Sequence, residues 1–355
     1  MALKLGLNLG YWGIGPQGDE AVEIVRSAES AGFDSVWAAE SYGSDVVSVL
    51  AWLAPQTETI KLGAAIMQVP ARPPAAAAMA GATLDALSGG RFIFGFGPSG
   101  PQVSEGWYGV PYSKPWGRTR EYIEIVREII AREGKLSYRG EHYQLPIEGG
   151  TGQGKALKLN FHPVRNEIPI FVGAIGRKSV EMAAEICDGW IPIFFSANAF
   201  EETWGEHLEA GFATGGRSRD EFEVSPSVQV AIDGDIEAAR SVVRAGLLLY
   251  LGGMGSRKTN FYVDLTHRFG FGEVADEVQS LFLDGKRDEA YKAIPDELVD
   301  TTALVGSEVE VAERIDKLAA AGVDRLICSP VHTEPTERMH TIERLAALVG
   351  TGATA

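Results

Sequence analysis

The chain has 355 residues, of which 45% are hydrophobic, and this is enough to build one continuous core. It carries 48 acidic and 32 basic side chains, so its formal net charge is −16. Because such a surface repels phosphate backbones and anionic headgroups, we expect neither nucleic acid nor a membrane as a partner. No apolar run approaches the about 18 residues of a membrane span. The first residues are typical of a strand and not of a signal peptide, so we expect a cytoplasmic protein.

Short strand-like runs alternate with amphipathic helical stretches along the whole chain. The predicted strands are, in order, 3–9, 35–39, 60–69, 91–97, 169–174, 190–195, 223–232 and 325–330. The predicted helices are 20–31, 46–54, 75–87, 117–132, 177–186, 200–212, 236–251, 308–321 and 336–348. Because each helix returns the chain to the same sheet edge, this alternation predicts a parallel sheet. Eight units favour a closed (β/α)8 TIM barrel over the alternative, a doubly wound open sheet.

Two segments interrupt this alternation, at about 134–167 and about 252–302. The first holds a glycine-rich stretch between short alternating pieces, which predicts a hairpin. The second has a mostly helical pattern. We therefore expect a single barrel domain, 1–355, with insertions after strand four and after strand seven.

The sequence argues against two other kinds of site, a dinucleotide-binding site and a metal site. Residues 95–100 match the spacing G-x-G-x-x-G, but Pro101 and a loop follow where a dinucleotide-binding fold needs a helix. The six histidines show no zinc-ligand spacing, so we expect no metal.

Four segments of the chain carry a family resemblance. They are V-W-A-A-E at 36–40, K-L-G-A-A-I at 61–66, A-T-L-D-A-L-S-G-G-R-F at 82–92 and V-G-A-I-G-R at 172–177. Together they resemble the luciferase-like oxidoreductases, and more narrowly the branch that uses the deazaflavin coenzyme F420. The third segment is the most specific, and the resemblance extends over nearly the full chain. It implies a (β/α)8 barrel, hydride transfer at the central ring of the cofactor and, commonly, a homodimer.

The turn after strand five is a candidate site for the anionic side chain of the coenzyme. Its residues are Gly173, Ala174, Ile175, Gly176, Arg177 and Lys178. The glycines allow the backbone to approach an anion, and the helix that begins here offers free N–H groups beside two basic side chains. The alternative is an ordinary glycine-rich turn with exposed basic residues.

The resemblance also implies a cofactor-binding role for Ala65 and Ile66. In the family, a non-prolyl cis peptide often forms a bulge in strand three behind the cofactor ring, and the matching bond here is Ala65–Ile66. Small side chains at Ala64 and Ala65 would allow a flat ring to approach. The alternative is a plain buried strand.

Glu40, Glu105 and Tyr42 are the candidate catalytic residues. Glu40 ends strand two in an apolar setting, where loss of hydration would favour the protonated carboxyl. Glu105 matches an acidic residue that exchanges a proton in some relatives, and its alternative is a solvated loop glutamate. Alcohol and sugar-phosphate dehydrogenases of the family place histidine directly after the strand-two acid. This chain has Ser41 there, so Tyr42 or Glu40 would have to substitute.

Trp12, Trp107, Arg257 and Lys258 are candidate substrate-binding residues. The two tryptophans would lie near the barrel mouth, where an indole can stack on a planar ligand. The glycine-containing segment 252–262 is a candidate lid, in which Arg257 and Lys258 would meet an anionic group. A simple surface loop is the alternative.

These observations predict an F420-dependent oxidoreductase, a reductase or dehydrogenase that transfers a hydride between the deazaflavin ring and a small organic substrate. The first alternative is an FMN-dependent luciferase-like monooxygenase, since a nitrogen in place of the central ring carbon supports oxygen activation. The second is a non-catalytic flavin-binding barrel.

Overall fold

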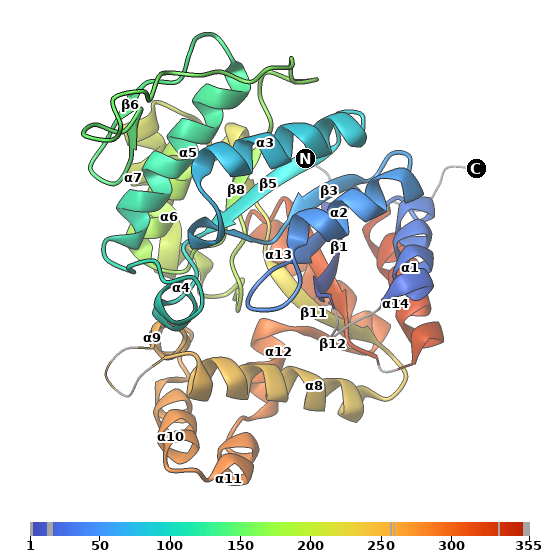
Figure 1. Cartoon of the computed structure of the whole chain (residues 1–355). Helices are drawn as coiled ribbons and strands as arrows, with labels where there is room; N and C mark the ends of the chain where they lie inside the picture. The colour runs from blue at the N-terminus through green and yellow to red at the C-terminus, as the bar shows by residue number, and fades with distance from the viewer. Residues whose placement is uncertain (1–2, 13–16, 256–257, 259, 333, 351–355) are drawn as a thin grey trace.

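The computed structural model describes residues 3–12, 17–255, 258, 260–332 and 334–350, and a ring of parallel strands lies at its centre (Figure 1). The ring strands are β1 (Lys4–Tyr11), β2 (Ser35–Ala39), β3 (Lys61–Ala64) with β4 (Met67–Gln68), β5 (Phe92–Gly97), β8 (Ile170–Val172), β9 (Gly189–Trp190), β10 (Glu223–Val224) with β11 (Ser227–Ile232), and β13 (Arg325–Pro330). They correspond to the eight predicted strands, of which the third and the seventh are interrupted.

Closure of the ring depends on the interrupted seventh strand. β10 pairs with β9, and β11 pairs with β13, which in turn pairs with β1. Between them, the N–H of Ser225 donates to the Trp190 carbonyl at 2.8 Å, and the N–H of Ile327 donates to the Pro226 carbonyl at 2.9 Å. The interruption is therefore hydrogen-bonded on both sides. The fold is the predicted TIM-barrel type, and the open doubly wound sheet is wrong.

Helices surround the ring and bury apolar faces against it (Figure 1). They are α1 (Gly18–Ser30), α2 (Val46–Leu53), α3 (Pro74–Leu87), α5 (Pro115–Ala131), α6 (Arg177–Ile186), α7 (Glu206–Gly215), α8 (Ile236–Leu248), α13 (Glu308–Ala320) and α14 (Pro335–Val349). Short turns of other helical types are η1 (Ala54–Gln56), η2 (Val69–Ala71), η3 (Glu201–Gly205), η4 (Arg219–Glu221) and η5 (Leu249–Gly253). In the described part of the chain, no helix combines the length and the apolar character needed to cross a bilayer.

The first insertion folds as predicted, and the loop before it contains an unpredicted helix. Between α5 and β8 the chain forms an antiparallel hairpin of β6 (Tyr138–Arg139) and β7 (Gln144–Leu145). The predicted loop 98–115 contains α4 (Pro101–Gly106). Proline at the first helical position is a start signal, but the glycines around this six-residue helix obscured it.

The second insertion is mostly helical, as predicted, and it has an apolar cluster of its own. Its helices are α9 (Phe261–Arg268), α10 (Gly272–Leu283), α11 (Arg287–Lys292) and α12 (Asp296–Thr302), which lie beside α8 in the lower part of Figure 1. The cluster includes Ala231 of β11. Ser227, four residues earlier on the same strand, accepts a hydrogen bond from Asn8 across the intervening β13 and therefore points into the barrel. Because side chains alternate along a strand, Ala231 also faces inward. The insertion therefore covers part of the carboxyl end of the barrel.

One strand beyond the ring was not predicted. β12 (Leu304–Gly306) pairs in parallel with Val230, Ala231 and Ile232 of β11. Three residues are too few to show an alternating pattern, and the pairing partner lies more than 70 residues earlier in the chain. The insertion therefore begins and ends beside the same ring strand.

The barrel interior is filled by side chains. Its buried apolar layer consists of Trp37, Ile93, Phe171, Ile191 and Ile327. Gly63 makes room for the largest of these, since a Cβ at that position would overlap the indole of Trp37. A ligand can therefore approach the ring only from one of its two ends.

A cluster of charges closes the amino-terminal end of the ring. Arg325 is 1% exposed and forms ion pairs with Asp34 at 2.7 Å and with Glu223 at 2.9 Å. Lys61 and Lys4 neutralise the same two carboxylates from outside. Burial alone would raise the pKa of Asp34 and of Glu223, but the attraction of Arg325 and the hydrogen bonds from the lysines outweigh it, so both pKa values are lowered. This end of the barrel is built for stability.

We expect Arg325→Met to lower the free energy of unfolding by about 3 kcal/mol at pH 7, because the substitution leaves two carboxylates without their buried partner. Since both pKa values are lower in the folded chain than in the unfolded one, the cluster stabilises the fold above the ordinary carboxyl pKa of about 4. That contribution is lost as the pH falls through the lowered values, so the difference between variant and wild type should shrink in acid. Urea unfolding of the variant and the wild type at pH 7 and at an acidic pH measures this difference, with the exposed Lys155→Met as control. A loss below about 1 kcal/mol at pH 7 would contradict the stabilising role.

Candidate functional site

The interruption between β3 and β4 forms the floor of the carboxyl end of the barrel. The Ala65–Ile66 peptide bond is cis, as expected from the sequence. Ala65 packs on the buried interior layer and remains half-buried, as does Ile66. A Cβ at Gly97 would overlap Cδ1 of Ile66, and a Cβ at Gly173 would press on its Cγ2. The two glycines therefore allow this isoleucine to lie flat across neighbouring strand ends.

Glu40 follows β2, is 5% exposed, and accepts four hydrogen bonds. The two terminal nitrogens of Arg72 donate to its two carboxylate oxygens, each at 2.9 Å. The backbone N–H groups of Gln68 and Val46 donate at 2.8 and 3.3 Å. Charge-assisted bonds of this kind fix a carboxylate in place. These contacts favour a positioning role for Glu40, which ties the end of β2 to β4 and to the start of α2. Proton transfer by Glu40 stays a prediction.

Arg72 is a site residue that the sequence did not reveal. It also forms an ion pair with Asp45 at 2.7 Å, and Asp45 accepts the N–H of Ser48 as the N-cap of α2. Burial alone would lower the pKa of Arg72, but the hydrogen bond and charge of Glu40, together with Asp45, raise it. Arg72 lies 32 residues after Glu40, so no local spacing relates the two. Only the turn after β4 brings them together.

The segment after β2, which begins with Glu40 and Ser41, is fixed by hydrogen bonds. The carbonyl of Ser41 accepts hydrogen bonds from Nε2 of Gln68 at 2.8 Å and from the hydroxyl of Tyr108 at 3.1 Å. The next residue, Tyr42, is 62% exposed and contacts Trp107, which is 65% exposed, with ring centroids 6.5 Å apart. The structure therefore brings together these two predicted site residues.

Glu105 lies in α4, two residues before Trp107, and not in a loop. It is exposed, and one of its carboxylate oxygens accepts the backbone N–H of Tyr112 at 3.0 Å. This bond holds the segment after α4. A catalytic role for Glu105 stays a prediction.

Three tyrosines and Phe194, from three distant parts of the chain, meet at the mouth. Tyr250 of η5 lies 4.7 Å from Tyr262 of α9 and 5.1 Å from Phe194, measured between ring centroids. A side-chain hydrogen bond links Tyr250 to Tyr11, which ends β1 and remains 38% exposed. Burial is the main cause that raises the pKa of Tyr11 and of Tyr250. Tyr11 is therefore the most exposed member of this group.

Two buried tryptophans hold the turn between β8 and α6. The indole N–H of Trp190 donates to the Ala174 carbonyl at 2.7 Å, and that of Trp204 donates to the Ile175 carbonyl at 3.0 Å. Helix α6 begins at Arg177, and its N-cap, Gly176, has no side chain that could satisfy the first N–H groups. The N–H of Ser179 donates to the Gly176 carbonyl at 3.0 Å, so the N–H groups of Arg177 and Lys178 are the ones available to an anion.

Two basic side chains, Arg177 at the start of α6 and Arg268 at the end of α9, lie within electrostatic range of each other. Partial burial lowers the pKa of Arg268, the positive charge of Arg177 lowers it further, and the negative charge of Asp264 opposes both effects. Within the described ranges, neither guanidinium forms an ion pair or a hydrogen bond. Lys178, by contrast, is paired with Glu181 at 2.9 Å on the surface. An anion bound near both guanidinium groups would offset their mutual repulsion. Sequence analysis found Arg177 but missed Arg268, which the second insertion supplies.

The remaining predicted substrate residues are not gathered at this site. Trp12 packs edge-on against Trp52 of α2, with ring centroids 5.5 Å apart. Lys258 is exposed, and Arg257 lies outside the described residues. Gly252, at the start of the predicted lid, packs against the ring of Phe282, because a Cβ there would overlap that ring. Among the described side chains, no group of three or more His, Cys, Asp or Glu could hold a metal ion.

Comparison with known proteins decides the family. The model of the luciferase-like monooxygenases matches residues 8–325. The chain belongs to the luciferase-like monooxygenase family. Among members of this family and its structural neighbours, three are informative.

A Mycobacterium tuberculosis protein, whose provisional name is coenzyme F420-dependent oxidoreductase, is 49% identical over 98% of this chain and 99% of its own. A 5,10-methylenetetrahydromethanopterin reductase from Archaeoglobus fulgidus is 32% identical over 90% of this chain and 92% of its own. The structure of a coenzyme F420-dependent tetrahydromethanopterin reductase from Methanopyrus kandleri superimposes with a TM-score of 0.78. It covers 98% of both chains at 25% identity.

We expect strong coupling in a double-mutant cycle of Glu40→Gln and Arg72→Met. Each single variant should lose about 3 kcal/mol of unfolding free energy, since a buried group is left without its partner. The double variant should lose about 2 kcal/mol less than the sum. Urea unfolding measures all three. The pair Lys178 and Glu181, in which the lysine side chain is 84% exposed, provides the control cycle, in which coupling should stay below about 0.5 kcal/mol. Additive losses at Glu40 and Arg72 would show that their ion pair does not position this site.

Proposed function

We propose that this chain is a coenzyme F420-dependent oxidoreductase that transfers a hydride between the deazaflavin ring and a small organic substrate. The observation that carries the proposal is the start of α6, where two guanidinium groups without an ion pair to any described residue, Arg177 and Arg268, lie within electrostatic range of each other and the first two N–H groups of the helix have no partner. In a chain with a net charge of −16, two such cations are best explained by an anionic ligand. The printed names of the Mycobacterium tuberculosis relative and the Methanopyrus kandleri structure indicate which coenzyme it is.

The residues at the barrel mouth fit this coenzyme. Arg177, Arg268 and the first N–H groups of α6 would hold the phosphate and carboxylates of its side chain. Ala65 and Ile66, half-buried above the filled barrel interior, would support the flat ring. When bound, the deazaflavin supplies a ring carbon that accepts or gives a hydride.

The side chains of the protein itself would position the reacting groups and supply proton donors. Glu40 and Arg72 hold the ends of β2 and β4 in place. Tyr11 is protonated at neutral pH, since burial raises its pKa further above the ordinary value, and its hydroxyl would donate at Oη to a substrate oxygen or nitrogen. Tyr42 and Glu105 are the other proton donors or acceptors that we propose. Trp107, which contacts Tyr42, would stack on the substrate.

The FMN-dependent monooxygenase and the non-catalytic flavin-binding barrel are less well supported. FMN carries its charge on one phosphate, whereas the F420 side chain also bears glutamyl carboxylates. Two guanidinium groups beside one helix start therefore suit the coenzyme with more anionic groups. A binding protein without catalysis has no need for the buried tyrosine group at the mouth.

We also propose that the chain forms one barrel domain, assembles as a homodimer and works in the cytoplasm. The homodimer rests on the family resemblance alone, and the cytoplasmic location rests on the composition. Light scattering of the purified chain would test the assembly, and a monomer at micromolar concentration would overturn it.

Titration with the two cofactors tests the proposed function. We expect the chain to bind oxidised F420 at least about tenfold more tightly than FMN, because only F420 offers carboxylates to the second guanidinium. Quenching of the cofactor's own fluorescence gives both dissociation constants. Tight FMN binding together with oxygen consumption by the reduced complex would support the monooxygenase instead. If the chain binds neither cofactor, both the oxidoreductase and the monooxygenase proposals are overturned.

Substitution of Arg268 tests the anion site separately. We expect Arg268→Ala to weaken F420 binding by about tenfold or more, since a hydrogen bond between charged groups is lost. The loss should diminish as the salt concentration rises, because screening weakens the same attraction in the wild type. The matched control is Lys292→Ala, an exposed basic residue at the end of α11. Equal binding by wild type and Arg268→Ala would remove this residue from the site.

A further inference from the structure

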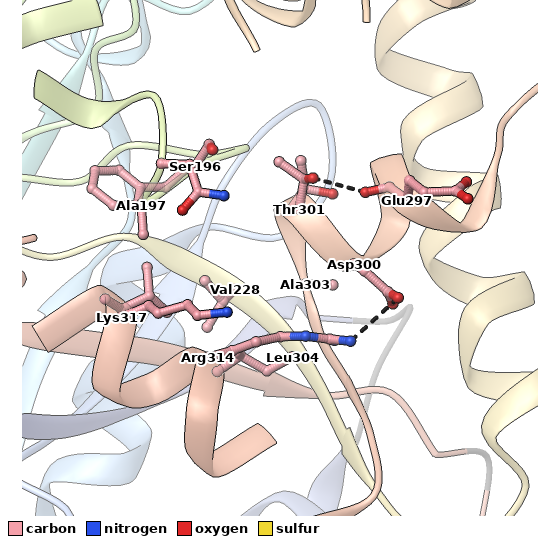
Figure 2. A pocket seen from close by; sticks show the side chains of 14 residues that line it. Ser196, Ala197, Val228, Glu297, Asp300, Thr301, Ala303, Leu304, Arg314 and Lys317 are labelled. Atoms are coloured by element: carbon pink, nitrogen blue, oxygen red, sulfur yellow. Dashed lines mark hydrogen bonds and ion pairs between the residues drawn. The ribbon is translucent and has the colours of Figure 1, made fainter. Parts of the chain in front are cut away.

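A cavity of about 300 Å³ lies outside the barrel wall. One wall is the segment after β9, including Ser196, and the others come from α12 and α13 (Figure 2). Val228 of β11 forms part of its floor. Because Ser227 points into the barrel, Val228, the next residue of the strand, points outward. The cavity therefore lies on the outer face of β11, and none of the residues proposed to hold the coenzyme lines it.

The charges around the cavity are paired, with one exception that faces it. The carboxylate of Asp300 forms ion pairs with Arg314 at 3.2 Å and with Arg240 at 3.4 Å, so its charge is neutralised. The carboxylate of Glu297 is turned away from the cavity in Figure 2. Lys317 is an exposed residue that lines the cavity with its ammonium group beside Val228 (Figure 2), and this ammonium group forms no ion pair or hydrogen bond with any described residue. One positive charge is therefore left for a ligand.

A hydroxyl group also lines the cavity. Ser196 belongs to the cavity wall, and its side chain forms no hydrogen bond with any residue that the structure describes. This hydroxyl can therefore bond to a ligand in the cavity.

The floor of the cavity is apolar. Val228, Leu304 and Leu318 line it and are 4%, 2% and 6% exposed. Apolar walls with a few uncommitted polar groups are typical of small-molecule sites, and the volume lies at the lower end of their range.

We propose that this cavity binds a small organic acid. Its carboxylate would pair with Lys317, its apolar body would cover Val228 and Leu304, and a polar atom would accept the Ser196 hydroxyl. The site is independent of the coenzyme and does not rest on the proposed function.

Binding of defined acids to the full-length chain tests the proposal. The probes are benzoate and hexanoate, with benzamide and hexanamide as uncharged counterparts, measured by ligand-observed NMR and calorimetry without coenzyme. We expect saturable binding of the acids, and binding of the amides to be about tenfold weaker, since they lack the charge that meets Lys317. Lys317→Met should weaken acid binding about tenfold, and Ser196→Ala should weaken it by a smaller factor. The exposed Lys158→Met is the matched control and should change nothing.

Two further outcomes decide against the proposal. No saturable binding of any probe at millimolar concentration would overturn it, as would binding that survives Lys317→Met unchanged. Competition with oxidised F420 separates this site from the mouth. Acid binding that persists at saturating coenzyme supports a second site, whereas displacement by the coenzyme would place the acid at the mouth and overturn the proposal.

Discussion

The filled interior of the strand ring is the constraint on which the rest of the molecule depends. Trp37 and its apolar neighbours occupy the space between the strands, and Arg325 with its two carboxylates closes the amino-terminal end. Chemistry can therefore take place only above the carboxyl ends, where loops are free to vary while the ring stays unchanged. The positions of Ala65 and of Glu40 follow from this one fact, because each comes directly after a ring strand.

Much of the fold could be predicted because its signals are local. Each ring strand is an apolar run followed by an amphipathic helix, and this alternation allows few topologies. β12 escaped prediction because three residues carry no periodicity and its partner strand is distant in the chain. The interruption of the seventh strand at Ser225 and Pro226 could not be predicted from the sequence either, because the hydrogen bonds of these two residues reach two different strands.

Less of the candidate site could be predicted, and the reason is again distance along the chain. Gly173 to Lys178 and the Ala65–Ile66 bond lie within short motifs, so the family resemblance was enough to single them out. Arg72, Tyr250 and Arg268 belong to no motif, and only the folded chain shows what they contact. The contacts of Glu40 also change its interpretation. An acid in an apolar stretch of sequence is expected to exchange protons, and the four hydrogen bonds that the carboxylate of Glu40 accepts add a positioning role that the sequence did not suggest. The contact of Trp12 with Trp52 could not be found from the sequence either, because the partner lies on α2, 40 residues along the chain, and substrate binding by Trp12 stays a prediction.

The pairing of β12 with β11 has a consequence for how such an enzyme can diversify. The chain leaves the ring after β11 and returns to the same strand through β12, so everything between is a detour anchored at one place. Its length and content can change while the spacing of the ring strands is preserved. Yet this detour delivers Tyr250, Tyr262 and Arg268 to the barrel opening. Exchange of the segment between β11 and β12 between homologous barrels would therefore change the residues that cover the active site and leave the ring of strands unchanged.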